Sequence, residues 1–168
     1  MRFLGFILLV FVLSPAFATA QQELPDPSVQ YWSNAERLAF IRQIGLHNLA
    51  TILQTGSQEE QASQASIHQV MNYNQAHIED HGVDNQITIT QQGYAQSATV
   101  ELRGDRNTEI VTQVGIENVF SLLSGLHAEI GAYSQVGSAN ELRIRKDAGI
   151  HTPLEIHQVG HGIRLIIE

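Results

Sequence analysis

Residues 43–56 read QIGLHNLATILQTG, and this stretch decides the fold. Asn, Ala, Ile and Gln occupy every second position from Asn48 to Gln54 and alternate with variable residues. This is the period-2 pattern of a β-strand with one buried face. Gly45 and Gly56 lie eleven residues apart, and we expect the chain to turn around each of them because glycine adopts conformations that other residues resist. The stretch therefore predicts strand, turn, strand and turn as one unit.

The glutamine that opens this stretch returns at a fixed interval. The spacing is 22 residues in the middle of the series, 26 before its second member and 23 before its last member. The six positions are Gln43, Gln69, Gln91, Gln113, Gln135 and Gln158, and all but Gln69 begin a Gln-x-Gly triplet. A short fixed period is typical of solenoids, in which each unit buries its apolar face by stacking on the next. The sequence therefore predicts an all-β, two-sheet β-solenoid of about six coils with 22 residues per coil, in which strands such as 85–91 end at the glutamine.

A column of large apolar residues repeats in both halves of this unit. Its twelve members are Ile41, Ile52, Ile67, Ile78, Ile89, Val100, Val111, Leu122, Tyr133, Ile144, Ile156 and Ile167. Most are β-branched, as a pleated and half-buried surface prefers, so we expect them to form the core. A second inward column lies two positions earlier, where Glu109 and Pro153 interrupt small and apolar residues without an evident reason. The interval of 23 residues near the end is interpreted as an insertion at His157.

Two polar columns accompany the apolar ones. The glutamines form the first, and the second contains Asn48, Asn74, Asn85, Asn107, Asn118 and Asn140, with Gln96 and Glu129 as variants. Side-chain amides stacked about 4.8 Å apart can bond to one another, so we predict inward ladders that satisfy otherwise unpaired donors and acceptors. The position at the end of the other strand is degenerate, with Gln54, Asp80, Leu102, Ser124 and Lys146. The chain is therefore not a uniform self-stacking unit.

The first twenty residues have the features of a secretory signal. Arg2 precedes an apolar run over 3–13, and Ala18-Thr19-Ala20 fits a small-residue cleavage site. The run is shorter than the ~20 residues that a membrane-spanning helix needs. An apolar first strand of the domain is the less favoured alternative. We expect a signal over 1–20, a flexible segment over 21–36 and the repeat domain over 37–168.

Charge and composition restrict the function. The net charge is −8, and removal of residues 1–20 leaves eight basic against 17 acidic side chains, which argues against nucleic acid as a partner. Cysteine is absent, so neither disulfides nor thiol chemistry are expected. The histidine pairs His77/His81 and His157/His161 have a spacing that brings ligands together on a helix, not on a strand. With no nucleophile elbow and no phosphate loop, we expect no catalytic, metal or cofactor site and no enzymatic activity.

The motif Gln-x-Gly-x-x-Asn-x-Ala-x-x-x-Gln resembles the curlin repeat of bacterial curli amyloid fibres. Gln43, Gly45, Asn48, Ala50 and Gln54 match it without a gap, and weaker copies extend to Glu168. The resemblance implies a structural protein of an extracellular fibre on the outer bacterial surface (fimbrium), with roles in adhesion and biofilm formation. It also implies export through the curli-specific pore with its accessory proteins, for which the segment 21–36 is similar to the secretion-targeting stretch.

Curlins include a major subunit, which forms the fibre body, and a minor subunit, which nucleates it. The degenerate, aliphatic repeats and the last repeat, which lacks the asparagine, resemble the minor subunit. The resemblance implies the major subunit and further copies of this chain as partners, by stacking of strand edges. We expect a docking edge at Arg164, Leu165, Ile166 and Ile167. A major fibre subunit remains an alternative, and a soluble β-solenoid that binds or cleaves polysaccharide is a remoter one.

Overall fold

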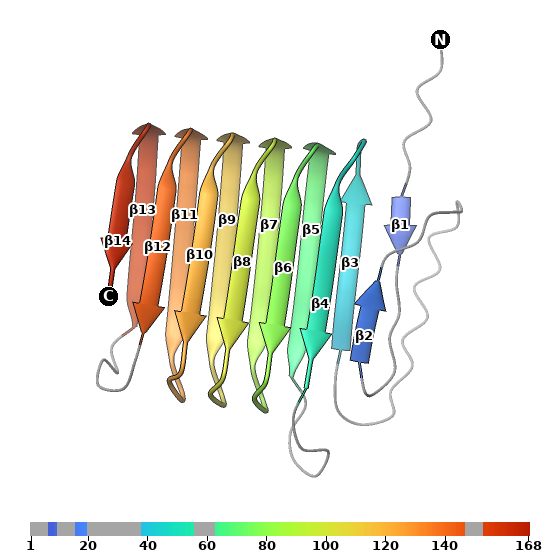
Figure 1. Ribbon diagram of the computed structural model, residues 1–168, viewed down its shortest axis with the longest axis vertical. Helices are drawn as coiled ribbons and strands as arrows, with labels where there is room; N and C mark the ends of the chain where they lie inside the picture. Colours follow the sequence, from blue (N-terminus) through green and yellow to red (C-terminus); the bar gives the residue numbers. More distant parts are fainter. Residues whose placement is uncertain (1–6, 10–15, 20–37, 56–62, 147–152) are drawn as a thin grey trace.

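A computed structural model describes residues 7–9, 16–19, 38–55, 63–146 and 153–168. These residues form fourteen strands in two seven-stranded sheets and contain no helix. The described part accordingly has no helix long and apolar enough to cross a membrane. Figure 1 shows the strands stacked side by side in a single row of coils, and the two-sheet β-solenoid predicted from the sequence is confirmed.

Twelve strands alternate between the two sheets as the chain advances. The first sheet holds β3 (Leu38–Ile44), β5 (Gln64–Asn72), β7 (Gln86–Tyr94), β9 (Thr108–Ile116), β11 (Ile130–Ser138) and β13 (Leu154–His161). The second sheet holds β4 (Leu49–Gln54), β6 (Gln75–Asp80), β8 (Ser97–Leu102), β10 (Val119–Ser124), β12 (Glu141–Lys146) and β14 (Arg164–Ile167). Neighbouring strands of this set pair in parallel. We call β3 with β4 coil 1 and continue to β13 with β14, which is coil 6.

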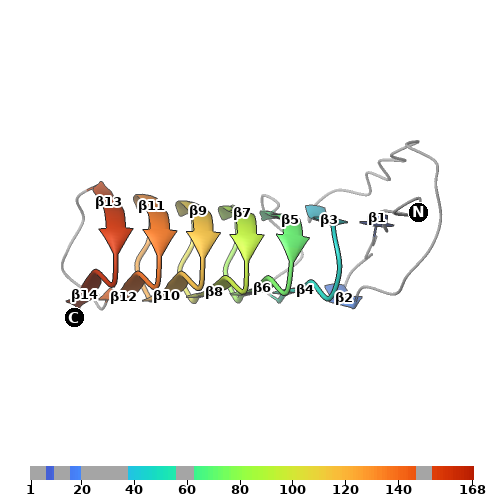
Figure 2. The same cartoon turned by 90° about the horizontal axis from the view of Figure 1, so that it is seen from above.

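The core lies between the two facing sheets, which Figure 2 shows from above as two rows of strands. Strict alternation of inward and outward side chains, as in β8 and β10, positions it. Of the twelve residues predicted for the core, eleven are at most 9% exposed. Ile167 is only partly buried, since coil 6 has no further coil stacked on it.

In β7, β9, β11 and β13 the glycine of the Gln-x-Gly triplet lies inside the strand and the turn follows it, which corrects the sequence prediction, whereas Gly45 begins the bend after β3. Strands of the first sheet continue past the glutamine, so that β7 includes Gln91 and ends at Tyr94. The left-handed turn residues lie two positions after the glycine, or after Met71 where the glycine is missing, and their φ angles are 53–60° at His47, Tyr73, Ala95, Glu117 and Ala139. Met71 takes the equivalent place in coil 2 with a φ of 79°, and the glycines of the other coils have a different role. A Cβ atom on Gly115, whose φ is +125°, would lie 1.9 Å from the carbonyl oxygen of Gly137 in the next coil.

The placement of the inserted residue also needs correction. β11 and β13 are offset by 23 residues along their whole length, from Gly131 opposite Leu154 to Gln135 opposite Gln158 and beyond. The extra residue therefore precedes Leu154 and is not His157. Leu154, rather than Pro153, takes the place in the second inward column and packs against the core. An insertion inside β13 would have turned its apolar side chains to the outer face.

Two short strands cover the N-terminal edge of the solenoid. β1 (Ile7–Leu9) pairs with β3, and β2 (Ala16–Thr19) pairs with β4, both antiparallel. Both strands fall within the predicted signal, whose cleavage after Ala20 stays a prediction. The predicted secretion-targeting segment 21–36 lies outside the described residues.

Candidate functional site

The inward glutamines form one hydrogen-bonded ladder through all six coils. In each step the Nε2 of one glutamine donates to the Oε1 of the glutamine in the following coil, over 2.6–2.8 Å from Gln43 to Gln158. A second bond from Nε2 reaches the backbone of the second sheet, as in Gln91 to the carbonyl oxygen of Gln75 at 2.9 Å. The side chains are at most 5% exposed. Each glutamine therefore links its coil to the following coil through its side chain and to the second sheet of the preceding coil through the backbone bond, and the ladder has a direction.

The asparagines make a second ladder that runs in the opposite sense. The backbone N–H of Asn74 donates to Oδ1 of Asn48 in the preceding coil at 2.9 Å, and Asn140 donates in the same way to Asn118 at 3.2 Å. The Nδ2 atoms donate forward, as in Asn74 to the carbonyl oxygen of Gly93 at 2.9 Å. Each coil thus needs a short acceptor side chain in the coil before it.

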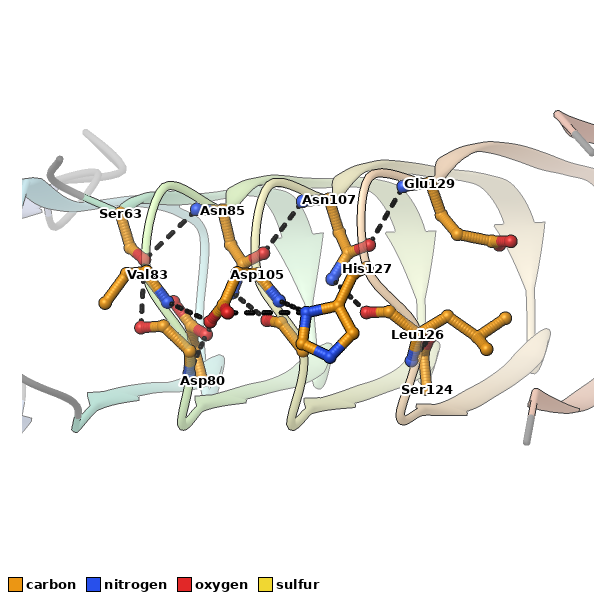
Figure 3. A network of polar contacts seen from close by, with 12 residues as sticks. Ser63, Asp80, Val83, Asn85, Asp105, Asn107, Ser124, Leu126, His127 and Glu129 are labelled. Atoms are coloured by element: carbon orange, nitrogen blue, oxygen red, sulfur yellow. Dashed lines mark hydrogen bonds and ion pairs between the residues drawn. The ribbon is translucent and has the colours of Figure 1, made fainter. Parts of the chain in front are cut away.

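The opposite turn repeats this arrangement, as Figure 3 shows. The N–H of Asn107 donates to Oδ1 of Asn85 at 2.8 Å, and the N–H of Glu129 donates to Oδ1 of Asn107 at 3.0 Å. In the first step the acceptor is Oγ of Ser63, which lies 3.2 Å from the N–H of Asn85. Serine can therefore replace asparagine as the acceptor.

Gln96 shows the effect of a longer side chain in the asparagine column. This longer side chain turns its Nε2 to the carbonyl oxygens of Gln92 and Gly115, at 3.1 and 3.0 Å. Its Oε1 is buried without a hydrogen-bond partner. Among the described residues the N–H of Asn118, in the next coil, has no acceptor either. The side chain in this column thus decides whether the backbone N–H at the same position of the following coil has a hydrogen-bond acceptor.

Coils 4 and 5 contain a buried charged cluster that the sequence analysis did not assemble. Nζ of Lys146 lies 3.0 Å from Oε2 of Glu129 and 3.6 Å from Oε1 of Glu109, and all three side chains are at most 2% exposed. The ammonium also lies 5.6 Å from the centre of the Tyr133 ring. Two acids and one base therefore replace apolar and amide groups inside the solenoid.

A missing side chain makes room for this cluster. A Cβ atom on Gly131 would lie 1.9 Å from Oε2 of Glu109 and 2.3 Å from the hydroxyl oxygen of Tyr133. Burial raises the pKa of the Glu109 carboxyl, and the nearby Lys146 charge opposes this rise. Burial and the adjacent Glu109 also raise the pKa of Tyr133. The available sequence signal was that Glu109, Glu129 and Lys146 each break a column within two adjacent coils.

The predicted docking residues lie on β14, the outermost strand of the second sheet. Leu165 is in register with the buried Leu142 but is 38% exposed, because no further coil covers it. Ile166 points outward and is 44% exposed, and Arg164 pairs with Glu141 at 3.1 Å. Ile163 stands in the asparagine column and offers no acceptor. The last coil therefore presents apolar side chains and an interrupted ladder.

The histidines of the two sequence pairs lie near the surface, and most have a polar partner there. His81 lies 2.8 Å from Glu79, His157 lies 2.8 Å from Glu155, and His161 bonds to Ser138 at 2.7 Å. Within the described ranges no three His, Cys, Asp or Glu side chains gather as a metal site would require.

A family model described as curlin associated repeat matches residues 82–115. The matched span includes Asn85, Gln91, Gly93, Asn107 and Gln113, which are members of the ladders and of the Gln-x-Gly triplets. No curated protein and no solved structure matches the chain. The match supports the curlin resemblance expected from the sequence and does not distinguish a minor from a major subunit.

Proposed function

We propose that this chain, a curlin-repeat protein, is the minor subunit of a curli-type fibre and nucleates the polymerisation of the major subunit at the cell surface. The curlin repeat supports an amyloid subunit of an extracellular surface fibre with no enzymatic role. Nucleation, adhesion and biofilm formation, and export through the curli pore, belong to the proposal.

The difference between the solenoid's two ends is the observation that favours nucleation. Coil 1 carries the full motif with Gln43, Gly45 and Asn48, whereas coil 6 has Ile163 in the asparagine column. A fibre body built from identical subunits needs a last coil that complements the first coil of the next copy, because the subunits stack head to tail. A chain whose last coil lacks the acceptor that its first coil needs is better suited to start a fibre than to extend one.

The exposed edge of coil 6 supports a role in surface attachment. Terminal repeats of solenoids are ordinarily closed by polar caps, but Leu165 and Ile166 leave this end apolar. An unpaired parallel edge of this kind accepts strands from a partner. We therefore assign the predicted docking edge, Arg164–Ile167, to the membrane anchor at the outer surface.

We expect a small molar fraction of this chain to shorten the lag of fibre formation by a major curli subunit. The reason is that a preformed parallel edge removes the slow step of assembling the first coils. Thioflavin fluorescence against time measures the lag. In cells, deletion of 157–168 should release the chain from the surface while coils 1 to 5 remain folded, as fractionation and circular dichroism would record.

Two controls separate the alternatives. A shuffled-repeat chain of the same composition should leave the lag unchanged. If equimolar amounts of the intact chain co-polymerise without shortening the lag, the major-subunit alternative is favoured. A stable soluble monomer that cleaves polysaccharide would support the enzyme alternative. Normal surface attachment of the truncated chain would place the anchor-binding edge elsewhere, with coil 1 as the next candidate.

A further inference from the structure

The hydrogen bonds at the N-terminal edge are incomplete in a specific way. In every later coil the glutamine Oε1 accepts a bond from the preceding coil, but among the described residues Oε1 of Gln43 accepts none. The N–H of Asn48 likewise has no acceptor in the described part of the chain, whereas the equivalent N–H of Asn74 has one. The edge therefore lacks one donor and one acceptor, both of which a preceding coil would supply.

The spacing of these two groups specifies the side chains that would fit. Inside the solenoid the donor is a glutamine Nε2 and the acceptor is an asparagine Oδ1 or a serine Oγ. Gln43 and Asn48 lie five residues apart, so the complementary coil carries Gln-x-Gly-x-x-Asn or Gln-x-Gly-x-x-Ser. The same edge already pairs with the short strands β1 and β2, although antiparallel, which shows that its backbone accepts added strands.

The chain's own last coil meets only part of this requirement. Gln158 would place an Nε2 donor over Gln43, and Gly160 retains a φ of +145° with no backbone atom within 4 Å of its Cβ position. Gly160 thus keeps the conformation that, in earlier coils, leaves room for the carbonyl of the next coil. Ile163, in contrast, would stand before the N–H of Asn48 and cannot accept its hydrogen bond. Head-to-tail addition of a second copy would therefore bury an unpaired donor.

We propose that the N-terminal edge of coil 1 is the docking surface for the last coil of a different curlin-type chain, one with asparagine or serine where this chain has Ile163. Ile163 then disfavours self-addition and reserves the edge for that partner. The identity of this partner rests on the proposed function. The structure adds which end of the solenoid binds the partner, in which direction the hydrogen bonds run and which residues select the partner. Removal of the residues that contain β1 and β2 uncovers the edge.

The test changes Ile163 in the processed chain, residues 21–168, and needs no second protein. Fibres are grown to completion, and the concentration of residual soluble chain is measured after sedimentation. Ile163→Asn and Ile163→Ser should lower this concentration about tenfold, since each restores one buried hydrogen bond per subunit contact. Ile110→Asn makes the same chemical change on the outward face of β9, away from both ends of the solenoid, and should leave the concentration at the wild-type value.

Truncation after Lys146 gives a second, independent measurement. It makes Asn140 the last member of the column and should also lower the residual concentration relative to the wild-type chain. If the two Ile163 variants and the truncated chain all match wild type, the edge inference is wrong. A control variant Ile110→Asn that polymerises as well as Ile163→Asn would likewise overturn it. Neither result would affect nucleation of a major subunit, which the lag measurement tests separately.

Discussion

Gly115→Ala is expected to destabilise the solenoid by about 4 kcal/mol or more, which places it among the most damaging single substitutions. The φ of +125° is unfavourable for any side chain, and the new Cβ would lie 1.9 Å from the carbonyl oxygen of Gly137. Relief of that overlap requires coils 4 and 5 to separate, which weakens the Gln113–Gln135 bond as well. Urea unfolding followed by circular dichroism measures the loss.

Gly125 provides the matched control for this substitution. It lies in the same pair of coils, but a Cβ atom there would have no heavy atom within 4 Å. Gly125→Ala should therefore change the free energy of unfolding by less than about 1 kcal/mol. Equal losses in the two variants would show that the coils do not approach each other as closely as described.

Lys146→Met is the second substitution with a large expected effect, a loss of about 3–5 kcal/mol concentrated in coils 4 to 6. The change removes the ammonium that lies within 3.6 Å of both buried carboxyls and leaves Glu109 and Glu129 without a charged partner. Hydrogen exchange of the amides in β9 to β14 should increase, while that in β5 to β7 changes little. Arg143→Met is the control, since its exposed pair with Glu141 contributes less than about 1 kcal/mol.

The loss in Lys146→Met should depend on pH. The folded-state pKa of Glu109 is raised by burial, so the folded state binds the proton more tightly than the unfolded chain does. Stability therefore falls as pH rises from the unfolded pKa of about 4.3 through the folded pKa. Without Lys146 this fall should be larger and extend to higher pH, because the ammonium no longer lowers the pKa of Glu109, and the variant should regain part of its stability on acidification. A pH-independent loss would contradict this account of the cluster.

The fold was predictable because its signals are local and repeated. The spacing of Gln69, Gln91 and Gln113, together with the alternation around Ile89 and Val100, determines the sheet, the face and the register of each strand. The glycines were misinterpreted because a positive φ suits both a turn and a close backbone approach. The sequence does not indicate that the carbonyl of Gly137 occupies the space beside Gly115, which the structure shows.

The charged cluster could not be derived from one column at a time. Glu109, Glu129 and Lys146 belong to three different columns, and their contact depends on how the second sheet faces the first. Gly131 was the additional clue, as its missing side chain leaves room for the Glu109 carboxyl. The direction of the two hydrogen-bonded ladders could not be predicted either, because a column of glutamines or asparagines does not indicate which coil donates.

X-ray diffraction from aligned fibres of the processed chain tests the central claim, that the coils continue along the fibre axis from one subunit to the next. The account predicts a reflection at about 4.8 Å along the axis and one near 10 Å across it, from the strand and sheet spacings. Fibres whose 4.8 Å reflection lies across the axis would contradict it.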